Sequence, residues 1–369
     1  MKVLLLSTGA KIGGEETFTR NLALALQKKG IDVRVCPGGS VQKEDLQKNG
    51  ITICEEDITG RSPLGLLKGA KAISRYANEQ GIDVIHAQAV GPAIMGVFAK
   101  KLYSCKVPWL WTNHGITDFA YNHIVKHLNK LDLVISNSDY VYVMLKNHGV
   151  SESRLKRIHN GINVSDFSVS TDEQISNRKR VEKEFGINPN NRIITYVGRL
   201  SPEKGVNVLL EAFQSLHIEK PETVCLLIGD GVERKKYEEY VANSNCKDNY
   251  IFAGFRKDIK ELLSASDILV LPSLIETFSL TTLQAFVAGA TVVASDVGGT
   301  PEQVLPEFNG MLFKSLNAED LKSKLVYILD NPEKAYIYKR HAKELCENYL
   351  NEDRMTEEIV SAYKELIKK

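Results

Sequence analysis

Long hydrophobic runs are absent from this 369-residue sequence. A transmembrane helix needs roughly 20 consecutive apolar residues, and no segment approaches that length. The apolar start, Val3–Ser7, is also too short for the apolar region of a signal peptide and is soon interrupted by Gly9 and Gly14. We therefore interpret it as a first buried strand and expect a cytoplasmic protein.

Cysteines are few and scattered. The six stand at positions 36, 54, 105, 225, 246 and 346, without a CxxC pair or a spaced Cys/His cluster. This distribution argues against a metal site or a redox centre and favours free cytosolic thiols.

Two other patterns are missing. There is no DxD triplet, the usual means of holding a divalent ion on a nucleotide diphosphate, and we therefore predict no metal and no other cofactor. There is also no basic run with interleaved aromatic residues, which excludes nucleic acid as a partner. Residues 1–170 carry 21 Lys and Arg against 15 Asp and Glu, and the rest carries 26 against 31. This basic excess suits an anionic partner such as a membrane surface, or is ordinary surface variation.

Short apolar runs alternate with helical patterns along both halves of the chain. In the first half the expected strands include Val3–Ser7, Asp32–Cys36, Asp83–His86, Trp109–Thr112, Leu133–Ser136 and, ending the series, Arg157–Gly161, with helices over Glu16–Lys29 and Gly65–Gln80. In the second half they include Arg192–Val197, Val224–Ile228, Tyr250–Ala253, Ile268–Leu271, Thr291–Ala294 and Gly310–Phe313. Such alternation predicts α/β architecture with parallel sheets covered on both faces.

A polar stretch, Asp166–Gly186, interrupts this alternation and is interpreted as a linker passing into a helix. We therefore predict two Rossmann-like doubly wound domains, 1–168 and 169–350, with a C-terminal helix in 351–369 that packs back on the first domain. Since ligands bind beyond the carboxyl ends of parallel strands, the site is expected in a cleft that the two domains face.

The most informative segment begins at Pro272. Glu276 follows a strand-like apolar run, and a short polar turn then leads into a helix-like segment from Leu280 to Ala288. A strand–loop–helix junction directs backbone N–H groups and the positive end of a helix at one point, which suits phosphate. Glu276 is placed to bind sugar hydroxyls, and Gln284 lies two helical turns later on the same helix face.

Two further loops carry candidate residues. Arg199 and Lys204 stand on one glycine-framed loop after a strand, and a guanidinium with an ammonium suits a diphosphate, although two solvated surface charges are an equal alternative. Gly13 and Gly14 precede a helix and permit close approach to a ligand. They do not form a GxGxxG fingerprint, which disfavours a nicotinamide enzyme.

His114 follows the apolar run that ends at Thr112, where it is placed to donate to a sugar hydroxyl or to meet a developing charge. A lone histidine is more often structural, and His86 is interpreted in that way.

Together these motifs resemble the large retaining glycosyltransferases of family four, whose fold is called GT-B, over nearly the whole chain. The matching pieces are GG-x-E at Gly13, T-x-HG at Thr112, NGI at Asn160, GRL-x-x-EKG at Gly198, IGDG at Ile228, AGF at Ala253, PS-x-x-E at Pro272 and GG-x-PE at Gly298.

The resemblance implies a role for each matching position. Arg199, Lys204 and the Gly13–Gly14 pair would hold the donor diphosphate, Glu276 the transferred sugar, and the N–H groups of Phe278, Ser279 and Leu280 a phosphate. Gly229, Asp230, Gly231, Phe255 and Arg256 would border the nucleobase. His114 would face the reacting bond, and Asn160 would lie on the acceptor side.

One position departs from the family pattern. The family usually has a second Glu eight residues after the first, where it accepts from both ribose hydroxyls; here that residue is Gln284. Glutamine keeps one acceptor oxygen but loses the charge, and a charge-assisted bond is about twice as strong as a neutral one. The substitution predicts weaker nucleotide affinity or a different hold on the ribose.

We therefore predict a retaining, metal-independent glycosyltransferase that uses a nucleotide diphosphate sugar, with UDP the default from the resemblance, and a carbohydrate or lipid-linked hydroxyl acceptor, as in cell-surface polysaccharide or glycolipid synthesis. A nucleotide-sugar epimerase, a non-catalytic nucleotide-sugar-binding subunit and, least favoured, a nicotinamide dehydrogenase stay open. The segment Tyr121–Leu131, apolar at helical spacing, is either a peripheral membrane contact or an ordinary half-buried helix.

Overall fold

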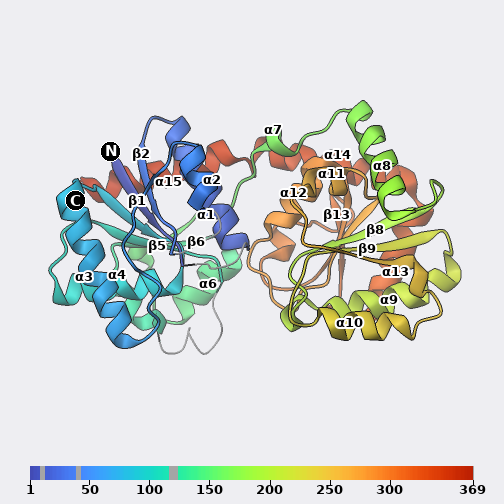
Figure 1. Cartoon of the computed structure of the whole chain (residues 1–369), viewed down its shortest axis with the longest axis horizontal. Helices are drawn as coiled ribbons and strands as arrows, with labels where there is room; N and C mark the ends of the chain where they lie inside the picture. The colour runs from blue at the N-terminus through green and yellow to red at the C-terminus, as the bar shows by residue number, and fades with distance from the viewer. Residues whose placement is uncertain (9–12, 39–42, 116–123, 369) are drawn as a thin grey trace. The chain divides into compact units, whose positions relative to one another are not determined.

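The computed structural model describes residues 1–8, 13–38, 43–115 and 124–368. The chain folds into two compact units (Figure 1). The first comprises Met1–Asn160 and Glu352–Lys369, and the second comprises Gly161–Asn351. The division falls before the boundary that the sequence suggested after residue 168, because Ile162 is buried in the core of the second unit and donates its backbone N–H to Leu350 O at 2.9 Å.

The first unit contains a seven-stranded parallel sheet of order β3-β2-β1-β4-β5-β6-β7. Its strands are β1 Lys2–Leu6, β2 Asp32–Cys36, β3 Thr52–Ile53, β4 Val84–Ala87, β5 Trp109–Asn113, β6 Leu133–Ser136 and β7 Leu155–Arg157. Its helices are α1 Gly14–Lys28, α2 Lys43–Lys48, α3 Pro63–Gln80, α4 Val90–Leu102, α6 Asp139–Asn147 and α15 Glu352–Ile367, with 3-10 turns η1 Val125–Lys130 and η2 Glu152–Arg154.

The second unit contains a six-stranded parallel sheet of order β10-β9-β8-β11-β12-β13. Its strands are β8 Arg192–Val197, β9 Thr223–Ile228, β10 Tyr250–Gly254, β11 Ile268–Leu271, β12 Thr291–Ser295 and β13 Gly310–Phe313. Its helices are α7 Val164–Phe167, α8 Thr171–Phe185, α9 Val206–Glu219, α10 Arg234–Ala242, α11 Ile259–Ser264, α12 Leu280–Ala288, α13 Ala318–Asp330 and α14 Pro332–Asn348, with 3-10 turns η3 Pro202–Lys204, η4 Lys247–Asn249 and η5 Thr300–Glu302.

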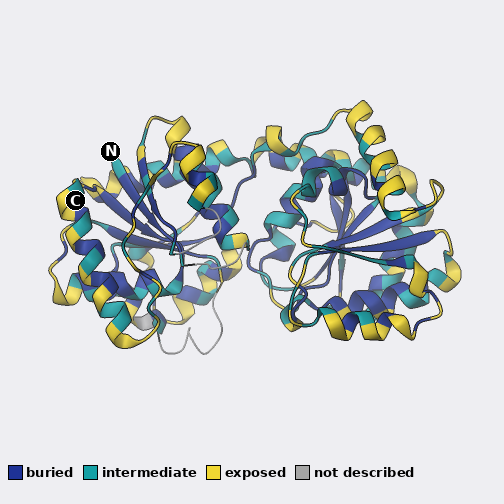
Figure 2. Ribbon diagram, in the orientation of Figure 1, coloured by how far each residue is buried: buried dark blue, intermediate teal, exposed yellow. Residues whose placement is uncertain are grey.

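Both sheets are buried between helices, which confirms the predicted doubly wound architecture. In the second unit, α9 and α13 cover one face and α8, α11 and α12 the other (Figure 1). The central strands are buried along their length (Figure 2), because a parallel sheet with helices on both faces needs apolar side chains on both. In β9, β11 and β12 the polar side chains, Thr223, Thr291 and Ser295, stand at the ends of the strands.

Each sheet has one point at which the strand order reverses. It lies between β1 and β4 in the first unit and between β8 and β11 in the second. The chain leaves neighbouring strands in opposite directions there, so the loops at the carboxyl ends part and expose a crevice in which α/β proteins bind ligands. Gly13 follows β1, Arg199 follows β8 and Glu276 follows β11, so this topology places the predicted residues at the switch points.

One strand differs from the prediction. The last strand of the first unit is Leu155–Arg157, not Arg157–Gly161: Leu155 packs into the core, and the Ile158 N–H donates to Ser136 O of β6 at 2.9 Å. The predicted linker passes into a helix as expected, because α8 begins at a capping box formed by Ser170 and Glu173.

Two alternatives were open for Tyr121–Leu131, whose first three residues lie outside the described part. In the rest of the segment, Val125, Leu128 and Leu131 are buried in the core of the first unit. This burial favours the alternative of an ordinary half-buried segment. None of the helices in the described ranges combines the length and hydropathy of a membrane span.

The C-terminal helix α15 is attached to the first sheet through a buried histidine. His86 on β4 is fully buried, with Nδ1 2.6 Å from the Tyr363 hydroxyl and Nε2 2.7 Å from the Thr112 hydroxyl. Burial lowers the pKa of His86 to about 3, with a smaller effect from His114, so the ring is neutral at physiological pH. The structural role that the sequence suggested for His86 agrees with these contacts.

Replacing Tyr363→Phe is expected to destabilise the first unit by roughly 1–3 kcal/mol, because one ring nitrogen of His86 would remain buried without a partner. Both tryptophans, Trp109 and Trp111, lie on β5, so their fluorescence during urea unfolding reports on this unit. Tyr103→Phe, at a side chain 37% exposed, is the matched control. An unchanged unfolding midpoint for Tyr363→Phe would contradict the anchoring role.

Candidate functional site

Lys204 and Glu276 meet at the switch point of the second unit. Lys204 Nζ lies 2.8 Å from Glu276 Oε2, and the two side chains are 26% and 18% exposed. Ser273, which sequence reasoning missed, donates its hydroxyl to the same oxygen at 3.3 Å. The structure thus joins a cation predicted for phosphate to the acid predicted for the sugar.

Two glycines allow the loops that carry this pair to approach one another. Gly205 has φ +60°, and a Cβ there would stand 2.0 Å from Pro272 O. Gly298 has φ +55°, and its Cβ would stand 2.0 Å from Glu276 O. Any side chain at either position would push the backbone of the Glu276 loop away. Leu274 N–H also donates to Glu203 O at 2.9 Å, which fastens the loop after β11 to the loop after β8.

Arg199 lies on the same loop as Lys204 but is held less firmly. Its side chain is 66% exposed, and its Nη1 is 3.9 Å from Glu203 Oε1. The Ser201 hydroxyl donates to that same carboxylate at 2.6 Å. Burial raises the pKa of Glu203, but the Ser201 hydrogen bond and the nearby cations outweigh it, so the pKa is lowered overall. An exposed guanidinium just after a strand, with a single ion pair at 3.9 Å among the described residues, is available to an anion.

The N-terminus of α12 has fewer available donors than the resemblance implies. The Ser279 N–H, expected to touch phosphate, donates to Gln303 Oε1 at 2.8 Å, and Gln303 Nε2 returns a bond to Ser279 O at 2.9 Å. Gln303 is fully buried, so this reciprocal pair fixes the turn. The Ser279 hydroxyl caps Thr282 N–H at 3.3 Å. Phe278 is buried and Leu280 is half-buried at the first position of the helix, where backbone N–H groups have no intrahelical partner.

The predicted nucleobase residues lie at the carboxyl ends of β9 and β10. The Gly229 N–H donates to Gly254 O at 2.8 Å, and the Asp230 carboxylate accepts the Gly231 N–H at 2.7 Å. Phe255 follows β10 with its ring 55% exposed. An exposed ring beside a polar loop suits a flat base.

Arg256 is engaged elsewhere. Its guanidinium donates to both oxygens of Asp258 at 2.8 Å, pairs with Glu184 and lies 5.6 Å from the Phe185 ring centroid. The Arg256 hydrogen bonds hold the pKa of Asp258 well below its usual range. The Arg256 guanidinium thus joins α8 to the loop after β10. Its predicted contact with the base is therefore not supported. Gln284 is half-buried on α12.

At the switch point of the first unit, Gly13 is the extended N-cap of α1, and a Cβ on Gly14 would meet open space. Glu15 and Glu16 occupy the first turn of that helix. Glu15 accepts a hydrogen bond from the Ser7 hydroxyl at 3.1 Å. Burial, reinforced by the charge of Glu16, raises the pKa of Glu15 to about 7 against the opposing hydrogen bonds.

His114, at the end of β5, contacts two side chains that sequence reasoning missed. Its Nε2 is 2.9 Å from Gln88 Oε1, and its ring centroid is 4.5 Å from that of Phe18. Burial lowers the pKa of His114 to about 3, so the imidazole is neutral. Gln88 is only 1% exposed, and in the described part of the chain its Nε2 has no hydrogen-bond partner. Its place directly after β4, beside the strand-order reversal, was the available signal. Asn160 is buried at the end of the first unit.

Glu15 gives the protein a testable pH dependence. Because its pKa is about 7 in the folded state and 4.5 ordinarily, the folded state binds more protons between these values, and stability is lost as pH rises through that window. Glu15→Gln is therefore expected to raise the free energy of unfolding by about 1–3 kcal/mol at pH 8 and to change it little at pH 4. Tryptophan fluorescence during urea unfolding measures the difference from wild type at each pH. Glu44→Gln, an exposed acid on α2, is the control, and equal effects of Glu15→Gln at both pH values would refute the assignment.

Comparisons with known proteins agree with this arrangement. A model described as Glycosyltransferase Family 4 matches residues 12–166, and one described as Glycosyl transferases group 1 matches residues 177–345. An uncharacterized glycosyltransferase of Methanocaldococcus jannaschii is 30% identical over 378 residues, covering 96% of this chain and 94% of the relative. The UDP-Gal:alpha-D-GlcNAc-diphosphoundecaprenol alpha-1,3-galactosyltransferase of Escherichia coli is 28% identical over 290 residues, covering 73% of this chain and 72% of the relative.

Among solved structures, Anabaena Alr3699/HepE in complex with UDP-glucose is similar in fold, with a TM-score of 0.88 and 22% identity over 99% of this chain and all of that chain. The sequence prediction of the family and of the GT-B fold is confirmed. The chain belongs to family 4 of the glycosyltransferases.

Proposed function

We propose that this glycosyltransferase moves a hexose from a nucleotide diphosphate sugar, preferably UDP-linked, to a hydroxyl of a carbohydrate or lipid-linked acceptor, with retention at the anomeric carbon. The observation that carries the proposal is the Lys204–Glu276 pair at the carboxyl ends of β8 and β11. A cation for phosphate and an acceptor for sugar hydroxyls stand side by side, as a sugar bonded directly to a diphosphate requires.

In this proposal the pair separates when the donor binds. The Lys204 ammonium moves from Glu276 to the diphosphate, where the exposed Arg199 joins it. Glu276 then accepts hydrogen bonds from the sugar hydroxyls. Each charge exchanges one ionic or hydrogen-bonded partner for another, so neither is left desolvated and unpaired.

The bond between the anomeric carbon and the phosphate oxygen breaks as the bond to the acceptor oxygen forms on the same face. The acceptor's proton passes to the leaving phosphate oxygen. Negative charge grows on the diphosphate during this step, and Arg199, Lys204 and the N-terminus of α12 stabilise that charge more strongly in the transition state than in the ground state. These groups take the place of a metal ion in our mechanism.

Positive charge grows at the same time on the sugar ring. A neutral His114, with its pKa near 3, can approach that ring without electrostatic repulsion. The Gln88 Nε2 beside it, which has no hydrogen-bond partner among the described residues, is a donor for a hydroxyl oxygen of the donor sugar or the acceptor. Phe255 and the Asp230 loop would receive the base.

The proposal also includes the cellular location of the protein and the pathway in which it acts. All six cysteines are free and buried, which supports the proposed cytoplasmic location. The relative from Escherichia coli is named for a diphosphoundecaprenol-linked acceptor, which supports a lipid-linked acceptor and a role in surface polysaccharide or glycolipid synthesis.

Arg199→Ala and Lys204→Ala are each expected to lower kcat/KM by two orders of magnitude or more, because each removes charge stabilisation worth about 3–4 kcal/mol in the transition state. Lys235→Ala, at an exposed lysine of α10 paired with Glu239 at 3.9 Å, is the control. Transfer from UDP-sugars is followed by mass spectrometry, with and without EDTA, which should leave the rate unchanged. Wild-type rates in both site variants, or loss of activity in EDTA, would sink the mechanism.

Gln284 favours a second candidate, a nucleotide-sugar-binding subunit with little turnover. Gln284→Glu is expected to tighten UDP binding by about tenfold, corresponding to the roughly 1.4 kcal/mol that a charge-assisted bond adds to a neutral one. Calorimetric titration with UDP measures the change, and transfer assays of the same variant separate the candidates. Turnover in the wild type supports the enzyme; turnover that appears only in Gln284→Glu supports the binding subunit. Unchanged affinity would remove residue 284 from the ribose site, and donor alone converted to an isomer would indicate an epimerase.

A further inference from the structure

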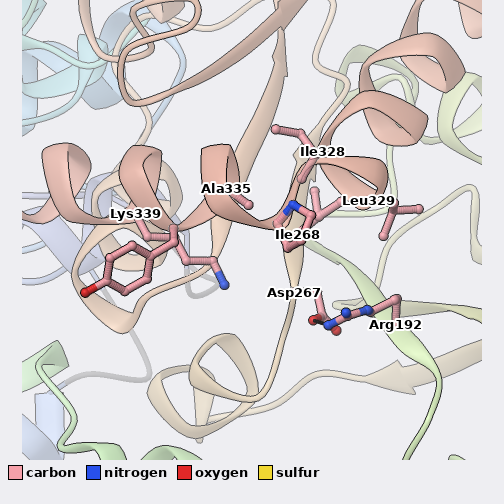
Figure 3. Close-up of a pocket in the computed structure, with 9 residues that line it drawn as sticks. Arg192, Asp267, Ile268, Ile328, Leu329, Ala335 and Lys339 are labelled. Carbon is pink, nitrogen blue, oxygen red and sulfur yellow. Dashed lines mark hydrogen bonds and ion pairs between the residues drawn. The ribbon is translucent and has the colours of Figure 1, made fainter.

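A cavity of about 180 Å³ lies at the amino-terminal ends of β8 and β11 in the second unit (Figure 3). Arg192 opens β8, and Asp267 directly precedes β11. The donor residues proposed above follow the opposite ends of the same two strands. Since the six-residue β8 spans roughly 20 Å, this cavity is separate from the Lys204–Glu276 pair.

The charged groups that line the cavity have an excess of positive charge. Asp267 accepts from Arg192 Nη1 at 3.0 Å through one oxygen, and from Arg178 Nη1 at 2.9 Å and the Ile193 N–H at 2.8 Å through the other. The Asp267 carboxylate is therefore shared by the guanidinium groups of Arg192 and Arg178. Arg178 and Glu182, which pair through Arg178 Nε at 2.7 Å, do not themselves line the cavity, whose charged lining residues are Arg192, Asp267 and Lys339.

Lys339 contributes a further cation from α14. Its half-buried side chain extends toward Asp267 and Arg192 (Figure 3), but no carboxylate of the described residues lies within ion-pair distance of its Nζ. Burial lowers the pKa of Lys339, the attraction of Asp267 opposes the change, and the charges of Arg192 and Arg178 add to it. An anion in the cavity would give this ammonium the partner that it lacks and would also engage the outer face of Arg192, whose side chain is half-exposed.

The remaining wall is apolar. It includes Ile268 at the start of β11, Ile328 in the last turn of α13, and the exposed Tyr336 ring one turn before Lys339. Such a surface gains little from a bare inorganic ion but buries part of a hydrocarbon or aromatic body. The volume is equivalent to that of about six water molecules at roughly 30 Å³ each, enough for an anionic head group with a few attached carbons.

We propose that this cavity is a second ligand site, which binds a small organic anion through Lys339 and Arg192 and packs its apolar part against Ile328 and Tyr336. The head group is a carboxylate or a phosphate monoester. The bound molecule links α14 to the starts of β8 and β11. The proposal does not depend on the identity of the sugar donor.

The test uses phenyl phosphate and benzoate as probes, phenol as the neutral counterpart and inorganic phosphate as the head group alone. Binding to the full chain is measured by ligand-observed NMR in the wild type and in the Arg199→Ala/Lys204→Ala double variant, where the donor-site cations are removed. One or both organic anions are expected to bind both proteins with affinities within about threefold of each other and at least tenfold more tightly than phenol or inorganic phosphate. Which of the two anions binds identifies the head group.

Lys339→Met, which keeps the aliphatic stem, and Arg192→Gln are each expected to weaken binding at least tenfold. Lys343→Met, one turn further along α14 and paired with Glu347 at 3.9 Å, should leave it unchanged. Circular dichroism spectra and unfolding midpoints establish that each variant is folded. Phenol binding as tightly as the anions, binding lost in the double variant, or binding retained in both cavity variants would overturn the proposal, as would the failure of both organic anions to bind.

Discussion

The ion pair between Lys204 and Glu276 depends on the topology of the second sheet. The two residues are far apart in sequence, but β8 and β11 are hydrogen-bonded neighbours because β9 and β10 lie on the other side of β8. The loops that leave this reversal meet only because Gly205 and Gly298 add no side chain against the Glu276 loop. A partly buried ammonium and carboxylate would each be costly alone. As a pair they keep two charged groups in place, and both remain available to exchange partners.

The first unit also has a strand-order reversal in its sheet, but the residues beside it differ in chemistry. The reversal between β1 and β4 brings Gly13 and Gln88 to one end of the sheet, and β5 adds His114 beside them. Here the groups are neutral or acidic: burial removes the charge from His114 and makes a proton on Glu15 easier to retain. We attribute the difference to the partner that each unit would meet, since phosphates require cations whereas sugar hydroxyls require only hydrogen-bonding groups.

The sequence contained enough information for the sheets and for placing the candidate residues directly after strands, because buried parallel strands are continuous apolar runs and polar loops follow their carboxyl ends. It also predicted the C-terminal helix within residues 351–369, which the structure has as α15. Contacts between residues distant in sequence were not visible. Nothing local in the sequence shows that Gln303 occupies the Ser279 N–H, or that Glu184 shares Arg256 with Asp258. The Asp166–Gly186 stretch was hard to interpret because α8 buries little apolar surface, with Val181 its one fully buried residue.

Whether a cation of the second unit is available to bind a diphosphate depends on these long-range pairs. It does not depend on the net charge of the unit. Arg256 is bound by two acids and rests on an aromatic ring, so moving it would cost several charge-assisted bonds. Among the described residues Lys204 has one carboxylate partner, and in our proposal the donor supplies its replacement. Within the same part of the chain Arg199 pairs only with Glu203, at 3.9 Å in an exposed setting, where an ion pair is worth about 1 kcal/mol or less. The ease of releasing a cation therefore falls from Arg199 to Lys204 to Arg256, and the two that are released most easily both lie between β8 and α9, at the switch point of the sheet.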